Sequence, residues 1–216
     1  MPGVRTEYRM RGLYAITPDV QNNEALLALV RAVLAGQPAL LQYRNKLASD
    51  ELRRVQAAAL LAECRAGGIP LIVNDDVDLA VAIGADGVHV GGDDGDVAEV
   101  RRRIGGQMLL GVSCYADFDR AVAARDAGAD YVAFGAVRPS GTKPRAVRAP
   151  LALFSRAGAL GLPLVAIGGI SLDNAAEVVE AGADMLAVIS DVFDSPDPAQ
   201  RAAAYQELFD RVEHDR

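Results

Sequence analysis

Short apolar runs recur along the chain, separated by longer stretches in which apolar residues fall at helical spacing. There are eight such runs, each four or five residues long. They lack the strict alternation of apolar and polar residues that marks a half-exposed strand, so each is predicted to be a strand buried on both faces of a parallel sheet. The predicted strands are 13–17, 40–43, 71–74, 87–90, 110–113, 131–134, 164–167 and 185–189.

The stretches between the runs place apolar residues three and four positions apart and contain few β-branched residues, a pattern typical of helices. Ser49 and Asp173 stand where a helix N-cap is expected, because their side-chain oxygens can accept from backbone N–H groups of the first turn. The predicted helices are 23–35, 49–66, 77–83, 97–103, 118–127, 150–159 and 172–181.

Three Gly-Ala-Asp triplets each precede a predicted strand. Glycine readily takes the left-handed conformation that ends a helix, so the triplets are interpreted as structural links at the N-terminal ends of the strands. The triplets are Gly84-Ala85-Asp86, Gly128-Ala129-Asp130 and Gly182-Ala183-Asp184.

This order of elements predicts an α/β fold, the (β/α)8 or TIM barrel, as a single domain over residues 1–216 with polar termini at 1–11 and 212–216. The alternative is an open doubly wound sheet, but no Gly-x-Gly-x-x-Gly motif follows the first run. In such a barrel the residues that follow each strand face one mouth, where the chemistry takes place.

Composition narrows the classes of partner. The net charge of −7 disfavours nucleic acid and acidic membrane surfaces, so an anionic ligand would need locally concentrated positive charge. Residues 1–12 are polar with no apolar core of signal-peptide type behind them, and no eighteen apolar residues run together. A cytoplasmic protein without a membrane span is therefore expected. Monomer and homodimer both stay open.

Positive charge gathers after the second predicted strand. Gln42, Arg44 and Lys46 occupy every second position, so an extended chain directs all three side chains to one side. Lys46 and Lys143 are the only lysines, against twenty arginines. Lysine binds phosphate as a compact point charge, so these residues indicate a site for a multiply charged phosphate group.

Carboxylates follow the next two strands. Asp75 follows the third strand and Asp94 the fourth, and Mg²⁺ typically takes one or two carboxylates together with phosphate oxygens. A magnesium site is the favoured interpretation, with general acid–base work by the pair as the alternative. Asp76 and Asp78 are interpreted as charges at a helix N-terminus.

Two further loops have features of phosphate sites. Gly168 and Gly169 follow the seventh strand, where glycine lets the backbone approach an anion and a helix N-terminus supplies N–H donors. The loop after the sixth strand carries small and hydroxyl residues before Lys143 and is predicted to fold over a bound phosphate.

The histidine and cysteines are assigned structural roles. His89 lies inside an apolar strand and is interpreted as a hydrogen-bonded structural residue. Cys64 is expected to pack on a helix. Cys114 lies near the mouth without an identifiable histidine partner, so a thiolate nucleophile is not expected. Neither the number nor the spacing of the two cysteines predicts a disulfide framework or a metal site.

In this order and at these strand ends, the motifs resemble the thiamine-phosphate synthase family. The resemblance runs from Leu13 to about Val192. The segments that carry it are Gln42-Tyr43-Arg44-Asn45-Lys46, Val73-Asn74-Asp75-Asp76-Val77-Asp78-Leu79-Ala80, Gly84-Ala85-Asp86-Gly87-Val88-His89-Val90-Gly91, Gly111-Val112-Ser113-Cys114, Phe134-Gly135, Thr142-Lys143 and Val165-Ala166-Ile167-Gly168-Gly169-Ile170.

The resemblance implies a reaction and a set of roles. The family joins an aminopyrimidine methyl diphosphate to a thiazole phosphate, giving thiamine phosphate and pyrophosphate. It implies Mg²⁺ held by Asp75 and Asp94. The implied catalytic residues are Arg44, Lys46, Ser113 and Lys143. The implied contacts of the pyrimidine diphosphate are Gln42, Tyr43, Arg44, Asn45, Lys46, Asn74, Ser113 and Lys143. The implied contacts of the thiazole phosphate are Ser140, Gly141, Thr142, Gly169, Ile189 and Ser190.

The chain departs from the family pattern at two places. Gly92 stands where the family usually has glutamine, which leaves open the hydrogen bonding beside the second metal aspartate. Arg138 is unusual in the loop after the sixth strand, where it either adds phosphate affinity or faces water.

Three other functions are weighed against the synthase. A relative that only rearranges the thiazole phosphate tends to lose the cationic motif around Arg44, which this chain keeps. A phosphosugar lyase or isomerase would need a Schiff-base lysine or an acid–base pair. A non-catalytic sensor of phosphate ligands would leave the paired aspartates without a purpose.

Overall fold

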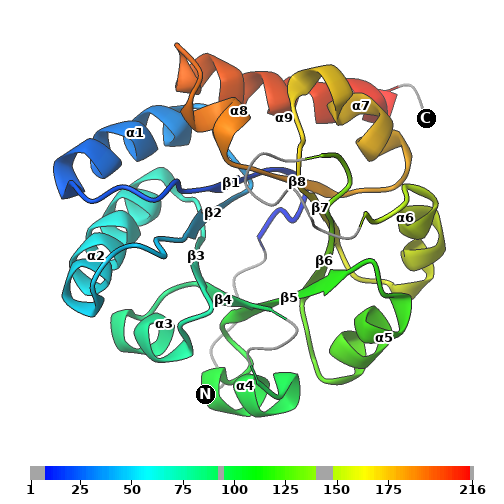
Figure 1. Ribbon diagram of the computed structural model, residues 1–216, viewed down its shortest axis with the longest axis horizontal. Coiled ribbons are helices and arrows are strands. Elements are labelled where there is room, and N and C mark those ends of the chain that lie inside the picture. The colour runs from blue at the N-terminus through cyan, green and yellow to red at the C-terminus, as the bar shows by residue number, and fades with distance from the viewer. Residues whose placement is uncertain (1–7, 92–94, 140–147, 215–216) are drawn as a thin grey trace.

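The computed structural model describes residues 8–91, 95–139 and 148–214, whose backbone forms a closed barrel of eight parallel strands (Figure 1). Each strand pairs with the next along the chain, and β1 also pairs with β8, with Gly12 opposite Met185. The closed ring confirms the predicted TIM barrel over the open sheet. The strands are β1 (Gly12–Ile16), β2 (Leu40–Tyr43), β3 (Leu71–Asn74), β4 (Gly87–Val90), β5 (Leu109–Tyr115), β6 (Tyr131–Gly135), β7 (Leu164–Ile167) and β8 (Met185–Val188).

Helices surround the strands on the outside of the ring (Figure 1). The seven predicted helices are present with ends within two residues of those expected, the sixth closing in a 3-10 turn at Gly158–Leu160. Two helices were not predicted, α8 and the long α9, which packs against α1 and α7. The helices are α1 (Asn23–Ala35), α2 (Asp50–Gly67), α3 (Val77–Ile83), α4 (Val97–Ile104), α5 (Phe118–Asp126), α6 (Ala152–Ala157), α7 (Leu172–Glu180), α8 (Ser190–Phe193) and α9 (Pro198–His214).

One of the two predicted helix caps is wrong. Ser49 is the N-cap of α2, and its side chain accepts from the Leu52 N–H at 3.2 Å, as predicted. Asp173 lies inside the first turn of α7, and Ser171 is the cap. The backbone N–H of Ser171 donates to the Asn174 side chain at 3.2 Å, so the turn is closed two residues before the predicted cap.

The core has two layers. The inner layer fills the barrel with side chains from alternate strand positions, among them Tyr14, Leu40 and Tyr131. The outer layer packs the opposite faces of the strands against the helices, with Phe134 and Phe154 in edge-to-face contact at 5.6 Å between ring centroids. Both faces of each strand are therefore buried, which explains why the runs lack polar alternation.

The aspartates of the Gly-Ala-Asp triplets fasten neighbouring strands at the bottom of the barrel. The Asp130 carboxylate accepts from the Leu110 N–H at 2.7 Å, while the Asp130 N–H donates to the Leu110 carbonyl at 2.8 Å. The Asp86 carboxylate accepts likewise from Leu71, and that of Asp184 from Leu164. We call these reciprocal pairs the aspartate clasps, and they confirm the structural interpretation of the triplets.

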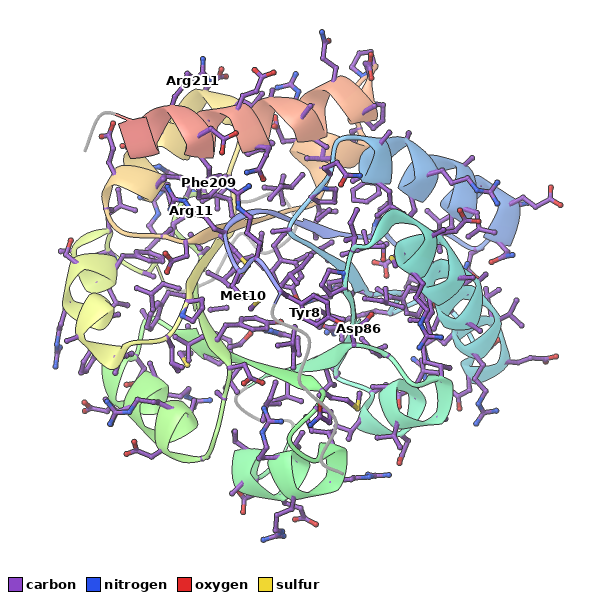
Figure 2. The ribbon with its side chains drawn as sticks, turned by 180° about the vertical axis from the view of Figure 1, so that it is seen from behind. Tyr8, Met10, Arg11, Asp86, Phe209 and Arg211 are labelled. Carbon is purple, nitrogen blue, oxygen red and sulfur yellow. The ribbon has the colours of Figure 1, made fainter. Side chains whose placement is uncertain are left out.

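The segment before β1 covers the same end of the barrel. Figure 2 shows Tyr8 and Met10 close to the barrel axis on this face, and both pack against the inner core layer. The Tyr8 hydroxyl donates to the Asp86 carboxylate at 2.8 Å. Residues 8–10 therefore close the bottom of the barrel, which leaves the opposite mouth as the open end.

Replacing Asp130 with alanine should lower the free energy of unfolding by about 3 kcal/mol, because a backbone N–H and the Arg101 guanidinium each lose a partly buried acceptor. Urea unfolding followed by circular dichroism measures the loss. Asp126→Ala is the control, since Asp126 pairs with Arg125 at the surface and its loss should change stability by less than about 0.5 kcal/mol. Equal losses in the two variants would contradict the clasp.

Candidate active site

A cavity of about 780 Å³ opens at the mouth of the barrel, at the carboxyl ends of the strands. We call it the mouth cavity. Ten residues predicted from the sequence line it, and they come from β2, β3, β5, β7 and β8 or the segments that directly follow them. They are Gln42, Arg44, Lys46, Asn74, Asp75, Ser113, Gly168, Gly169, Ile189 and Ser190.

Other predicted residues are not placed at this cavity. Asp94, Lys143, Ser140, Gly141 and Thr142 lie outside the described residues, as does the departure at Gly92.

The side chains of Tyr43 and Asn45 point away from the mouth cavity, toward helix α2. The Tyr43 hydroxyl donates to the Gln56 side-chain oxygen Oε1 at 2.9 Å, and the Asn45 side-chain amide donates to the same oxygen at 3.0 Å. Both side chains are buried. Their contribution to the site is to hold the loop after β2 against α2.

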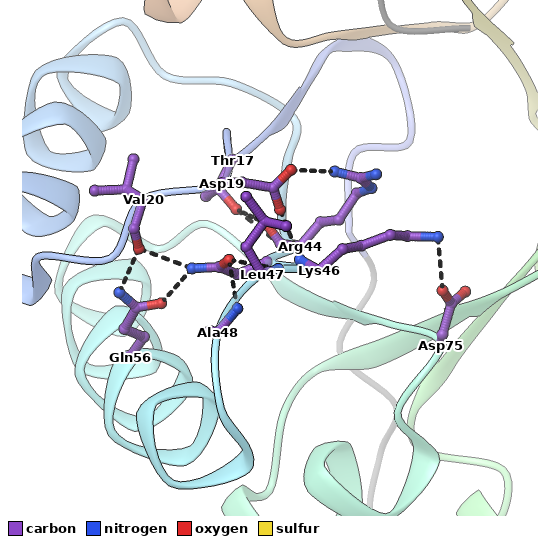
Figure 3. Close-up of polar contacts among 10 residues, drawn as sticks. Thr17, Asp19, Val20, Arg44, Lys46, Leu47, Ala48, Gln56 and Asp75 are labelled. Carbon is purple, nitrogen blue, oxygen red and sulfur yellow. Dashed lines mark hydrogen bonds and ion pairs between the residues drawn. The ribbon is translucent and has the colours of Figure 1, made fainter.

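The cationic loop after β2 is held by residues that follow β1. The Asp19 carboxylate lies 3.3 Å from the Arg44 guanidinium and accepts from the Lys46 backbone N–H at 2.6 Å (Figure 3). The buried Thr17 hydroxyl exchanges hydrogen bonds with the backbone of Arg44, at 2.9 and 3.0 Å. Arg44 and Lys46 are therefore positioned before any ligand arrives.

Asp75 is held in an unusual backbone conformation at the end of β3. Its φ of 62° is left-handed, a region that costs free energy for a residue with a side chain and is kept mainly where function requires it. The Asp75 N–H donates to the His89 carbonyl at 2.8 Å, and its carboxylate lies 3.7 Å from the Lys46 ammonium (Figure 3). A carboxylate and an ammonium thus meet at the cavity wall.

This arrangement fits a magnesium ion that is bound together with a diphosphate. Asp75 supplies a hard oxygen ligand, and its carboxylate is more than one-third exposed at the cavity. Mg²⁺ commonly takes one or two protein carboxylates and completes its shell with phosphate oxygens and water. Among the described residues no three His, Cys, Asp or Glu side chains come together as a possible metal cage.

Asp76 and Asp78 act at the N-terminus of α3, as predicted. The Asp76 carboxylate accepts from the Leu79 N–H at 2.9 Å as the N-cap. Asp78 lies in the first turn and forms an ion pair with Arg103. Neither residue lines the mouth cavity.

Gly168 and Gly169 form a close-packed turn on the far wall. Both have positive φ, 99° and 65°, and a Cβ at Gly169 would lie 2.3 Å from the Pro139 carbonyl oxygen. Glycine is needed here because the loop after β6 lies directly on the turn. Arg138, in that loop, forms an ion pair with Glu177 of α7, so it neither faces water alone nor points at the cavity.

The histidine prediction holds, and the structure adds a contact to it. His89 is 7% exposed, and its two ring nitrogens lie 3.2 Å from the Tyr131 hydroxyl and 2.9 Å from the Ser113 hydroxyl. It is hydrogen-bonded as predicted, but it also lines the mouth cavity beside a predicted site residue.

The cysteines take no part in the site. Burial raises the pKa of the Cys64 thiol and that of the Cys114 thiol to about 12. Neither forms a disulfide. A thiolate nucleophile is therefore disfavoured at Cys114, as the sequence indicated.

Sequence reasoning missed Asp19 and Tyr14. Tyr14 lies on β1 and Asp19 follows it, and the predicted site contains no residue from this strand end. The barrel fold brings all eight strand ends to one mouth, so the position of Asp19 two residues beyond Thr17 was an available signal.

The described helices include none long and apolar enough to cross a bilayer.

Comparison with known proteins gives a consistent result. The sequence profile of the family described as thiamine monophosphate synthase matches residues 13–192. A thiamine-phosphate synthase of Aromatoleum aromaticum is 60% identical over 203 residues, covering 94% of this chain and 98% of that protein. A thiamine-phosphate synthase of an Azoarcus species is also 60% identical over 203 residues, covering 93% and 98%. The solved structure of a thiamine phosphate pyrophosphorylase from Pyrococcus furiosus aligns with a TM-score of 0.83 at 31% identity, covering 94% and 98%.

Proposed function

Because this chain belongs to the thiamine monophosphate synthase family and catalyses that family's transferase reaction, we propose that its mouth cavity holds both substrates of thiamine phosphate formation at once. The substrates are an aminopyrimidine methyl diphosphate and a thiazole phosphate. The products are thiamine phosphate and pyrophosphate.

One observation carries the proposal. Two walls of the mouth cavity carry groups that could bind anions, and these walls face each other. Arg44, Lys46 and Asp75 follow β2 and β3, whereas the Gly168-Gly169 turn follows β7. Strands β3 and β7 stand four places apart in a closed ring of eight, so they are opposite walls. The first wall suits a diphosphate with its counter-ion, and the second suits a monophosphate that binds backbone N–H groups.

The reaction needs charge neutralisation and alignment. The bond between the pyrimidine methylene and the diphosphate oxygen breaks, and the electron pair leaves with pyrophosphate. Arg44 and Lys46 would stabilise the negative charge that grows on that oxygen. The aminopyrimidine delocalises the positive charge left on the methylene, and the thiazole nitrogen then forms the new C–N bond.

No general base is required. The thiazole nitrogen attacks through its lone pair and carries no proton, so the chain need not remove one. The remaining task of the site is to hold the two fragments in line, which lowers the entropic part of the barrier. Gln42, Asn74 and Ser113 would orient the pyrimidine diphosphate, and Gly169, Ile189 and Ser190 would contact the thiazole phosphate.

We further propose Mg²⁺ as the cofactor, with Asp75 and Asp94 as its protein ligands. When bound, it would supply Lewis-acid stabilisation to the departing diphosphate. The fit rests on the exposed carboxylate of Asp75 beside the Lys46 ammonium.

For residues outside the described ranges, the proposed roles rest on the family resemblance alone. Lys143 would address the diphosphate from the loop after β6, and Ser140, Gly141 and Thr142 would contact the thiazole phosphate. Tyr43 and Asn45 would contribute through their backbone or by holding the loop, since their side chains lie against α2. We place the enzyme in the cytoplasm.

The direct test is to mix purified protein with both substrates and Mg²⁺ and to measure thiamine phosphate and pyrophosphate by chromatography. Product should form only when both substrates are present, and chelation of the metal should stop it. Absence of product under these conditions would exclude the proposal. Pyrophosphate release from the pyrimidine substrate alone would indicate hydrolysis and not coupling.

Asp19→Ala should lower kcat/KM for the pyrimidine diphosphate by about 10-fold, because Arg44 and Lys46 lose the carboxylate that positions them. Asp19→Asn should lose less, since its amide oxygen can still accept from the Lys46 N–H. Steady-state kinetics with the thiazole phosphate saturating gives both values. An unchanged kcat/KM in Asp19→Ala would show that the cations keep their positions without Asp19.

A further inference from the structure

A chain of hydrogen bonds crosses the barrel interior beneath the mouth cavity. The Gln42 amide nitrogen donates to the Tyr14 hydroxyl at 2.7 Å, and the hydroxyls of Tyr14 and Tyr131 lie 2.7 Å apart. The Tyr131 hydroxyl lies 3.2 Å from His89 Nδ1, and His89 Nε2 lies 2.9 Å from the Ser113 hydroxyl oxygen. Five side chains from five strands are thus linked from one cavity wall to another.

The middle of this chain is closed to solvent. Tyr14 is 1% exposed and Tyr131 is fully buried, and burial raises the pKa of both hydroxyls, so both stay protonated. The Tyr131 ring lies over Gly111, where a Cβ would come within 2.1 Å of it, and it stacks beside the His89 ring at 5.6 Å. Tyr131 does not line the mouth cavity, whereas the other four members of the chain do.

The chemistry of the first member fixes the direction of the whole chain. An amide nitrogen can only donate, so the Tyr14 oxygen accepts from Gln42. Among the described contacts of the buried Tyr14 hydroxyl, the Tyr131 oxygen is the acceptor left for its single hydrogen. The Tyr131 hydrogen then points to His89 Nδ1, which accepts it.

The contact between His89 and Ser113 takes its direction from the rest of the chain. With Nδ1 accepting, the proton of the His89 ring is on Nε2, which donates to the Ser113 oxygen. The hydrogen of the Ser113 hydroxyl is then directed away from His89, and Ser113 faces the mouth cavity as a donor. If these hydrogen bonds ran in the opposite direction, the hydrogen of the Ser113 hydroxyl would point to the His89 ring.

We propose that His89, oriented through Tyr14 and Tyr131, is a positioning residue that makes the Ser113 hydroxyl donate to the pyrimidine diphosphate. This inference rests on the proposed function for the identity of the ligand. The direction of the hydrogen bonds is inferred from the contacts alone and does not depend on the proposed function. The effect is to present an anionic substrate with a donor and not with an oxygen lone pair.

The first test reads the His89 tautomer without substrate. The chain contains only two histidines, so ¹⁵N-labelled histidine and long-range ¹H–¹⁵N correlation spectra resolve both rings. We expect one ring with its proton on Nε2, identified as His89 by its loss in His89→Asn. In Tyr131→Phe and in Tyr14→Phe, this signal should shift toward a mixture of tautomers. A wild-type His89 ring with its proton on Nδ1 would overturn the inference.

The second test uses kinetics and a double-mutant cycle. Tyr131→Phe should lower kcat/KM for the pyrimidine diphosphate by about 10-fold, the value of one hydrogen bond to a charged group. KM for the thiazole phosphate should not change. In a Ser113→Ala background, Tyr131→Phe should cause less than about a 2-fold further loss, since the hydroxyl that the chain orients is gone.

Tyr8→Phe is the matched control, because it removes a tyrosine hydroxyl bonded to a carboxylate at the other end of the same core layer. It should leave the kinetics and the His89 signal unchanged. If the fold losses in kcat/KM of Tyr131→Phe and Ser113→Ala multiply fully in the double variant, Tyr131 does not act through Ser113. Its role would then be merely structural, and the proposal would be rejected. An inactive wild-type protein with the Nε2 tautomer would refute the proposed function and leave the chain direction established.

Discussion

Asp75→Asn should lower kcat by about 100-fold or more while leaving the fold intact. The substitution removes the negative charge that faces Lys46 across 3.7 Å and the hard ligand proposed for Mg²⁺. Asparagine tolerates the left-handed backbone found at this position, where φ is 62°, and it keeps the N–H that donates to the His89 carbonyl. Turnover should recover in part at high Mg²⁺ concentration, which steady-state kinetics at varied Mg²⁺ measures.

Asp76→Asn is the matched control for this experiment. It removes a carboxylate from the next residue, but asparagine still caps α3 through the Leu79 N–H. We expect nearly wild-type kcat and the same dependence on Mg²⁺. An Asp75→Asn enzyme with unchanged turnover, or equal losses in the two variants, would show that Asp75 has no specific role as a metal ligand.

Lys46→Gln should lower kcat/KM for the pyrimidine diphosphate on the order of 100-fold, because the charge growing on the leaving oxygen loses a cation in the mouth cavity. KM for the thiazole phosphate should change little, since the site proposed for that substrate is at the opposite wall. Lys46→Arg should recover only part of the loss, because a planar guanidinium does not replace a compact ammonium. Initial rates at varied concentrations of each substrate separate the two KM values.

Arg103→Gln is the control that tests whether the loss of any cation at this end of the barrel has the same effect. Arg103 pairs with Asp78 beside α3 and does not line the mouth cavity. Its replacement should leave both KM values unchanged. If Lys46→Gln and Arg103→Gln behaved alike, long-range charge and not a local contact would explain the effect.

Strands and most helices could be predicted because each depends on a local pattern. The fully buried runs of β1 to β8 read as continuous apolar segments, and their alternation with helices specified a closed barrel. Helix α9 was missed although Ala202, Tyr205 and Phe209 bury one face at helical spacing. The cap of α7 was misplaced because Ser171 and Asp173 are both suitable residues, and only the backbone path decides which of them precedes the first turn.

The site was predictable where strand periodicity alone decides the direction of a side chain. Alternation placed Gln42, Arg44 and Lys46 at the mouth cavity, and the same alternation turns Tyr43 and Asn45 toward α2, a distinction that family resemblance does not make. Contacts between distant segments were not predictable. The hydrogen bond that the Lys46 N–H donates to Asp19 depends on side-chain packing that no local pattern encodes, and so does the chain of hydrogen bonds through Tyr131.

The aspartate clasps divide the barrel into modules. Each clasp joins the beginnings of two consecutive strands, β3 with β4, β5 with β6, and β7 with β8, so three quarters of the ring repeat one two-stranded unit. In the first quarter Ala39 occupies the equivalent place and keeps only the backbone half, its N–H donating to the Leu13 carbonyl at 2.8 Å. The barrel is therefore built from a repeated two-stranded unit. The unit that differs is the first, where the chain enters the ring.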